Sequence, residues 1–134
     1  MSQTKAQLLN PLSGEVSSSD IKANSVSIGK GANSVAGNTV LGESALNAAV
    51  TGQNNTAVGK EALTTHTSGG SNVAVGGQAL KTQTTANNNT AVGFQALYSN
   101  TTANNNTALG FNTLLFNTTG TENTAVGALA LDAT

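Results

Sequence analysis

Apolar residues recur along this chain in two short phrases separated by polar residues. The first phrase is Asn-Thr-small-Val/Leu-Gly, as in NTAVG at residues 89–93. It returns every 17 residues, beginning at Asn38, Asn55, Asn72, Asn89, Asn106 and Asn123. A second phrase, most often Ala-Leu, begins three residues after the glycine of each copy. Six copies in a constant register predict a repeat architecture in place of one globular core.

The first phrase predicts a short β-strand that ends at the glycine. Side chains alternate along a strand, so Thr90 and Val92 share one face while Ala91 lies on the other. One copy has Val73 in place of threonine beside Val75, which favours the Thr/Val face as the core and leaves the alanine column outside. The core columns predicted in this way are Leu41, Val58, Val75, Val92, Leu109 and Val126, with Leu46, Leu63, Leu80, Leu97, Leu114 and Leu131.

A single unit cannot fold alone, because two large buried side chains do not offset about 17–30 kcal/mol of backbone entropy. Units stacked at about 4.8 Å would share backbone hydrogen bonds and one continuous core. The constant 17-residue spacing of Asn55, Asn72, Asn89 and Asn106 predicts a side-chain ladder along the stack. Sharp turns are expected at the phrase-ending glycines, which are Gly42, Gly59, Gly76, Gly93, Gly110 and Gly127.

These features predict an all-β solenoid with a thin core, and thin cores usually need association of several chains. Either the alanine column or the second apolar phrase would then form the contact between chains.

Along the chain, residues 1–20 lack the repeat, residues 21–37 are a transition with shorter repeats, and residues 38–134 carry the six 17-residue registers, the last one partial. The first region contains an apolar cluster that suits either a docking peptide or a disordered terminus: Leu8, Leu9, Pro11 and Leu12.

The repeats resemble two related families. Residues 24–32, NSVSIGKGA, resemble the head repeat of the YadA-like trimeric autotransporter adhesins. The 17-residue form NTAVGxxAL looks like repeats in bacteriophage tail fibres, and residues 17–26, SSSDIKANSV, are similar to the linkers that follow fibre attachment segments. The resemblance covers residues 24–134. It implies a left-handed β-roll in which three parallel copies pack around one axis as a homotrimer.

The resemblance to tail fibres implies a structural virion protein made in the host cytoplasm. Its N-terminal segment would bind a tail or baseplate protein, and its rod would contact a host-surface receptor, with glycans as one candidate class. The chain shows no apolar export signal and no C-terminal membrane barrel, both of which the bacterial adhesins need, and this favours the phage interpretation. The alternatives are a fragment of a secreted or cell-surface trimeric adhesin and an ice-binding solenoid.

Charge and composition narrow the function further. Only 8% of residues are charged, the net charge is -1 and arginine is absent, so a basic nucleic-acid-binding face is not expected. No apolar run approaches the roughly 20 residues of a membrane helix, so no membrane insertion is expected. Without cysteine the chain has no disulfide scaffold.

No catalytic constellation is recognisable, so we expect neither an enzyme nor a cofactor. His66 is the only histidine, and its polar surroundings predict a solvated loop residue; three symmetry copies of it around an axis would be the one way to hold an ion. The carboxylates Glu15, Asp20, Glu43, Glu61, Glu122 and Asp132 show no pairing of the glycosidase kind.

The aromatic residues gather late in the chain. Phe94 and Phe111 occupy the same register of adjacent copies, and Tyr98 and Phe116 lie close by. One interpretation is a stacked apolar ladder in the core or at the contact between chains. The other is a patch that contacts a sugar or receptor, since aromatic side chains suit both roles.

Overall fold

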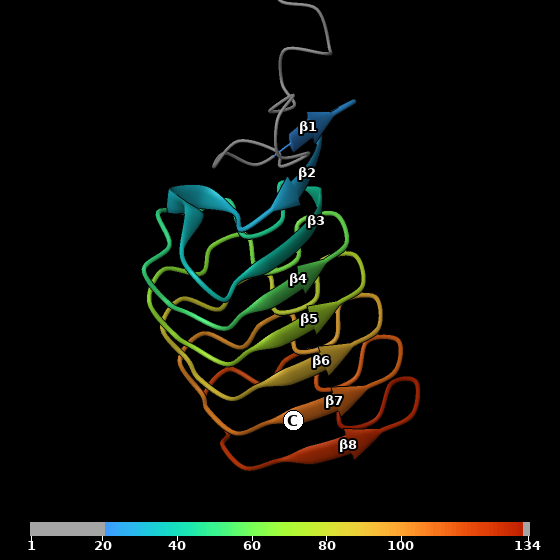
Figure 1. Cartoon of the computed structure of the whole chain (residues 1–134). Helices are drawn as coiled ribbons and strands as arrows, with labels where there is room; N and C mark the ends of the chain where they lie inside the picture. The colour runs from blue at the N-terminus through green and yellow to red at the C-terminus, as the bar shows by residue number, and fades with distance from the viewer. Residues whose placement is uncertain (1–20, 133–134) are drawn as a thin grey trace, which may run out of the picture.

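The protein forms a stack of β-coils, seen in a computed structural model that describes residues 21–132 (Figure 1). The eight strands within these residues belong to one sheet in sequence order. The strands are β1 (Ile21–Ala23), β2 (Val26–Gly29), β3 (Thr39–Glu43), β4 (Thr56–Val58), β5 (Val73–Val75), β6 (Thr90–Val92), β7 (Thr107–Leu109) and β8 (Thr124–Val126).

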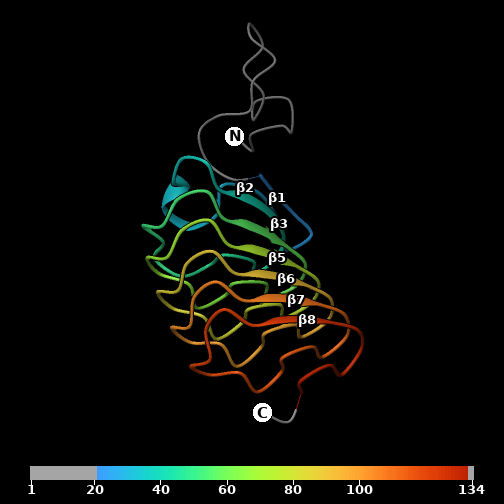
Figure 2. The same cartoon turned by 90° about the horizontal axis from the view of Figure 1, so that it is seen from below.

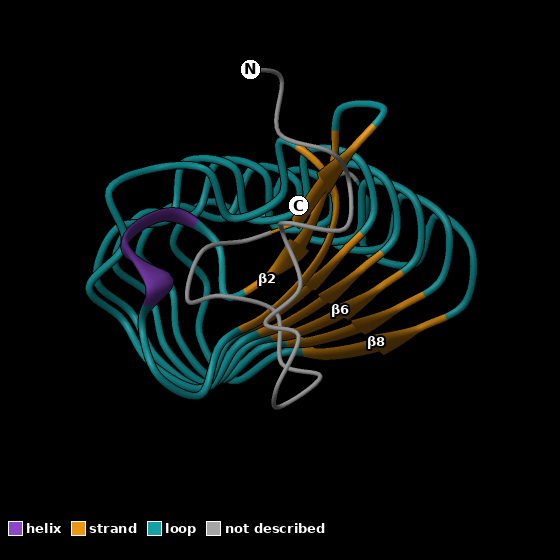
Figure 3. Cartoon of the chain, turned by 45° about the horizontal axis from the view of Figure 1, so that its top comes forward, coloured by secondary structure: helices purple, strands orange, loops and turns teal. Residues whose placement is uncertain are grey.

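Strands β3 to β8 are parallel, and each lies one coil further along the stack (Figures 1 and 2). Paired residues are always 17 positions apart, as in Ala74 opposite Ala91 and Val75 opposite Val92. The rest of each coil consists of turns that return the chain to the next strand (Figure 3). The predicted β-solenoid with a 17-residue repeat is therefore confirmed.

The N-terminal end of the stack has a different topology. Strands β1 and β2 form an antiparallel hairpin, and β2 also runs antiparallel to β3, with Ile28 opposite Leu41. A short 3-10 turn (Ala32–Ser34) lies between β2 and β3. The transition region thus adds a hairpin to the sheet in place of a shorter parallel coil. The apolar cluster predicted for docking, Leu8, Leu9, Pro11 and Leu12, lies outside the described residues.

The predicted facing of the strands is wrong. Ala57, Ala74, Ala91 and Ala108 are fully buried inside the coils. The strand-end column, predicted as core, points outward: Val58, Val75 and Val92 are half-buried by their neighbours in the stack, while Leu41, Leu109 and Val126 are 44%, 46% and 66% exposed. The leucine column is correct for Leu46, Leu63, Leu80, Leu97 and Leu114, which are buried. Leu131 is exposed, since no coil follows it among the described residues.

The reason lies in the asparagine that opens each strand. Asn89 and Ala91 are two residues apart and therefore share a face. The asparagine side chain is needed inside the coil, where its amide bonds backbone groups, so the alanine is drawn inward with it. Alanine leaves room for the leucine of the same coil, and β-branched residues suit the outer, half-covered face of a sheet. The Val73–Val75 pair therefore reflects strand propensity and not burial.

The predicted glycine turns are confirmed. All six phrase-ending glycines have φ between 123° and 156°. A Cβ built on Gly59 would lie 2.6 Å from the backbone of Gly76 in the next coil, so this corner requires glycine both for its dihedral and for close stacking. Each turn continues with non-glycine residues at positive φ, such as Gln95 at 55° and Leu97 at 52°.

Candidate functional site: buried ladders and the outer surface of the stack

A column of asparagine amides closes every coil and joins it to the next. In the third coil, Asn72 Nδ2 donates to the carbonyl of Ala86, 14 residues later, at 2.9 Å. Asn72 Oδ1 accepts the backbone N–H of Asn89, the first residue of the following coil, at 3.0 Å. The same pair of bonds recurs at Asn38, Asn55, Asn89 and Asn106. The predicted asparagine ladder therefore exists. Its repeated steps run from side chain to backbone, and Asn72 Nδ2 also donates to Asn55 Oδ1 at 3.0 Å.

A second buried polar column runs beside the first and contains His66. Its other members are Gln83, Asn100 and Asn117, each 17 residues further on. Gln83 Nε2 donates to the carbonyl of Ala86 at 3.2 Å, the oxygen that also accepts from Asn72. Each such carbonyl thus uses both of its lone pairs on side-chain donors. The two columns form a continuous amide network inside the stack.

The prediction that His66 is a solvated loop residue is wrong. Its side chain is 0% exposed, its Nε2 lies 2.6 Å from the carbonyl oxygen of Gly69, and its Nδ1 lies 3.4 Å from Gln83 Nε2. These partners fit a neutral ring that donates from Nε2 and accepts at Nδ1. Burial lowers the pKa of His66, while the Gly69 carbonyl opposes this shift in part. The available signal was its register, because the equivalent positions of the next three coils hold side-chain amides.

The outer face of the β3–β8 sheet carries two straight columns of small apolar or weakly polar side chains. One column holds Thr39, Thr56, Val73, Thr90, Thr107 and Thr124, and the other holds Leu41, Val58, Val75, Val92, Leu109 and Val126. Along β4 to β8 no outward side chain is charged. We call these two columns the outer sheet face.

An aromatic edge adjoins this face beyond the glycine corner. The rings of Phe94 and Phe111 stack with their centroids 5.9 Å apart and their planes 13° apart. The two side chains are 47% and 51% exposed, so they form the predicted stacked ladder on the surface and outside the core. The Phe94 ring also reaches back over Gly77 of the coil before. Phe116 is exposed elsewhere on these coils, and Tyr98 is half-buried.

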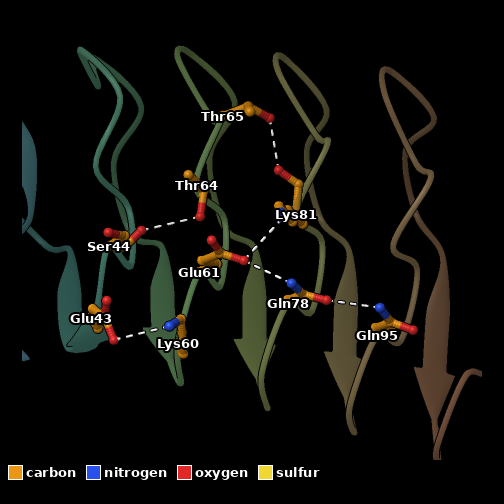
Figure 4. Close-up of polar contacts among 9 residues, drawn as sticks. All are labelled: Glu43, Ser44, Lys60, Glu61, Thr64, Thr65, Gln78, Lys81 and Gln95. Carbon is orange, nitrogen blue, oxygen red and sulfur yellow. Dashed lines mark hydrogen bonds and ion pairs between the residues drawn. The ribbon is translucent and has the colours of Figure 1, made fainter.

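Charged and amide side chains line the turns toward the N-terminal end, as Figure 4 shows. Lys60 pairs with Glu43 at 3.2 Å and Lys81 pairs with Glu61 at 2.9 Å. Gln78 Nε2 donates to Glu61 at 2.7 Å, and Gln95 donates to Gln78 in turn at 2.7 Å. The bond from Gln78, followed by that from Lys81, lowers the pKa of Glu61. These contacts join neighbouring coils on the exterior.

Lys81 shows how one side chain takes part in several of these contacts. Its bond to Glu61 raises its pKa, and its Nζ lies 5.8 Å from the ring centroid of Tyr98. Thr64 and Thr65 donate to backbone carbonyls of the neighbouring coils on either side, at 3.1 and 2.8 Å (Figure 4). The exterior polar contacts thus run along the stack axis, as the buried ones do.

Within residues 21–132, no group of three His, Cys, Asp or Glu side chains could hold a metal ion. The same residues contain no helix of the length and apolarity that a membrane crossing requires.

Comparison with family models, curated proteins and solved structures finds no match for this chain. A proposal about function must therefore rest on the arrangement of the coils.

Proposed function

We propose that the protein is a phage tail-fibre component, a structural protein of the virion that attaches the particle to its host. Three copies assemble in parallel as left-handed β-rolls, the N-terminal segment binds the tail or baseplate, and the rod contacts a receptor on the host surface. The protein acts mechanically and adhesively, without catalysis, a cofactor or nucleic acid.

The observation that carries this proposal is the continuity of the axial contacts. Backbone pairing, two buried amide columns and exterior side-chain bonds all connect one coil with the next. Bending or unwinding the stack would break many of these bonds together. A stiff stack suits a rod that holds its contacts at a fixed distance from an attachment point. Several copies side by side would multiply weak contacts through avidity.

Antibodies raised against the purified chain test this function on virus particles whose genome encodes the sequence. We expect the antibodies to label the tail and to reduce adsorption to host cells. Pre-incubating the cells with purified chain should also reduce adsorption, because free fibres would occupy the receptors. Labelling confined to a bacterial cell envelope would contradict the proposal and favour the cell-surface adhesin.

One observation favours a second candidate, an ice-binding solenoid. Thr39, Thr56, Thr90, Thr107 and Thr124 stand in one outward column, with one threonine per coil. Val73 interrupts this column, and the adjacent column is aliphatic. Thermal hysteresis of the purified protein separates the two functions, since a tail fibre should produce none.

A further inference from the structure

Neither of the two surfaces predicted from the sequence to form contacts between copies is available in the structure. The alanine column and the leucine column are buried within each single chain. Most of the large apolar side chains that remain exposed between β4 and β8 are on the outer sheet face and the aromatic edge, including Leu109, Phe94 and Phe111, while Phe116 is exposed elsewhere. We infer that the outer sheet face and the aromatic edge are the surfaces through which copies of this chain pack side by side, an inference that rests on the proposed fibre function.

The first argument for a second copy as the occupant is spacing. The outer sheet face presents a row of apolar side chains at one per coil, about 4.8 Å apart, over six strands. A partner that fills the gaps along the whole row needs side chains with the same spacing. Another stacked parallel sheet has that spacing, and this chain is one. A helix, with its 5.4 Å pitch, loses register with the row after a few coils.

The second argument is charge. The outward side chains of β4 to β8 are threonine, valine and leucine only, so two such faces can meet without burying an unpaired ion. Glu43 and Lys60, which directly follow the corner glycines of the first two coils, pair with each other. The face therefore suits an uncharged partner and gives no electrostatic recognition to a charged one.

The third argument is area: the face and the edge together are smaller than one side of a usual stable pair. Six strands at about 4.8 Å and a width of about five extended residues at 3.3 Å give roughly 480 Å² for the face and edge together. Stable pairs usually bury about 800 Å² per partner. In a closed ring every copy contacts two neighbours and uses two different surfaces. The chain offers two such surfaces, one on each side of the glycine corner formed by Gly93 and Gly110.

Lysine substitutions on the outer sheet face test the inference. In the full chain, V75K combined with V92K places two charges on the face in adjacent coils. The matched control, S68K with T85K, places two charges in adjacent coils at exposed residues outside the sheet. Circular dichroism reports the fold and native mass spectrometry reports the copy number. We expect the V75K/V92K chain to keep its β spectrum with about one third of the parent mass, while the control remains assembled.

Each outcome is decisive. An assembled V75K/V92K variant of parent mass would overturn the inference while leaving the fibre function standing. A parent chain of single-copy mass would remove both. If the lysine variant does not fold, V75T with V92T decides, because threonine already occupies the neighbouring outward column. That variant should dissociate at a concentration at least tenfold higher than the parent, and unchanged dissociation would overturn the inference.

Discussion

At the scale of the residue, one asparagine per coil provides hydrogen-bond partners for two backbone groups. Asn72 bonds the carbonyl of Ala86, which closes its own coil, and it accepts the N–H of Asn89, which begins the next. Its side chain is 0% exposed, so water cannot replace these bonds. Buried backbone groups that lose a partner cost about 1–3 kcal/mol each. The repeat therefore depends on this amide more than on any single apolar side chain.

Replacing Asn72 with alanine should destabilise the chain by about 2–5 kcal/mol, because two buried backbone groups lose their partners. Replacing it with aspartate should cost at least as much, since the donor is lost and a charge is buried. Urea denaturation of both variants checks this. Asn47, which is exposed, supplies the control: Asn47→Ala should change stability by no more than about 0.5 kcal/mol. Equal stability of the Asn47 and Asn72 variants would contradict the role of the amide.

His66 should make the stack sensitive to acid. Burial lowers its pKa in the folded state below the ordinary value of 6.5, so the unfolded chain binds a proton more readily. Stability is then complete above about pH 6.5 and falls as the pH decreases, by up to about 1.4 kcal/mol per unit until the folded-state pKa is reached. Thermal melts between pH 8 and pH 4 measure this effect.

The control for the acid effect is His66→Gln. Glutamine occupies the same register at Gln83, where its Nε2 bonds the corresponding carbonyl. The variant should fold and lose most of the decrease in stability between pH 6.5 and pH 5. If parent and variant melt in parallel over that range, the buried histidine is not the source of the acid sensitivity.

At the scale of the element, each coil from β4 to β8 contains one three-residue strand whose two faces have different size limits. Ala74 points into the coil, where Ala57 and Ala91 flank it along the stack. Val75 points outward, and its register holds leucine at Leu41 and Leu109. The inner position can accept little extra volume, while the outer one already accepts leucine.

Ala74→Leu should therefore destabilise the chain by about 1–3 kcal/mol or more through overpacking. Val75→Leu should stay within about 1 kcal/mol of the parent, because the same residue is accommodated in other coils. Chemical denaturation of this adjacent pair reports the facing of the strand directly. The opposite order of stabilities would restore the interpretation that the Thr/Val face is the core.

The sequence was sufficient for the period, the strands, the turn glycines, the asparagine ladder and the leucine column. Each of these follows from a fixed spacing or from a residue type with one structural role, such as Gly59 at φ 127°. The facing of the strand was missed because Thr-x-Val suits either side of a sheet. The environment of His66 was missed because its polar sequence neighbours suggest an exposed loop. In the structure the side chain lies inside the coil, where the Gly69 carbonyl accepts hydrogen bonds from both His66 and Asn55.

At the scale of the whole molecule, stability should be a sum over coils and the contacts between them. Deleting residues 73–89 removes one complete repeat and leaves Asn72 followed by Thr90, so every register is preserved. We expect this shorter chain to fold with the same β spectrum and a lower melting temperature. Deleting residues 73–81 should unfold the following coils, because the amide and leucine columns would lose their alignment. Equal melting of the two deletions would contradict the coil-by-coil account.

The most direct test of the central claim, that three copies of the stack assemble into one fibre, is sedimentation equilibrium of the unmodified full chain. We predict a mass of about three times the 13.2 kDa chain mass at all concentrations accessible to the instrument. A folded species that sediments at 13.2 kDa at those concentrations would contradict the claim.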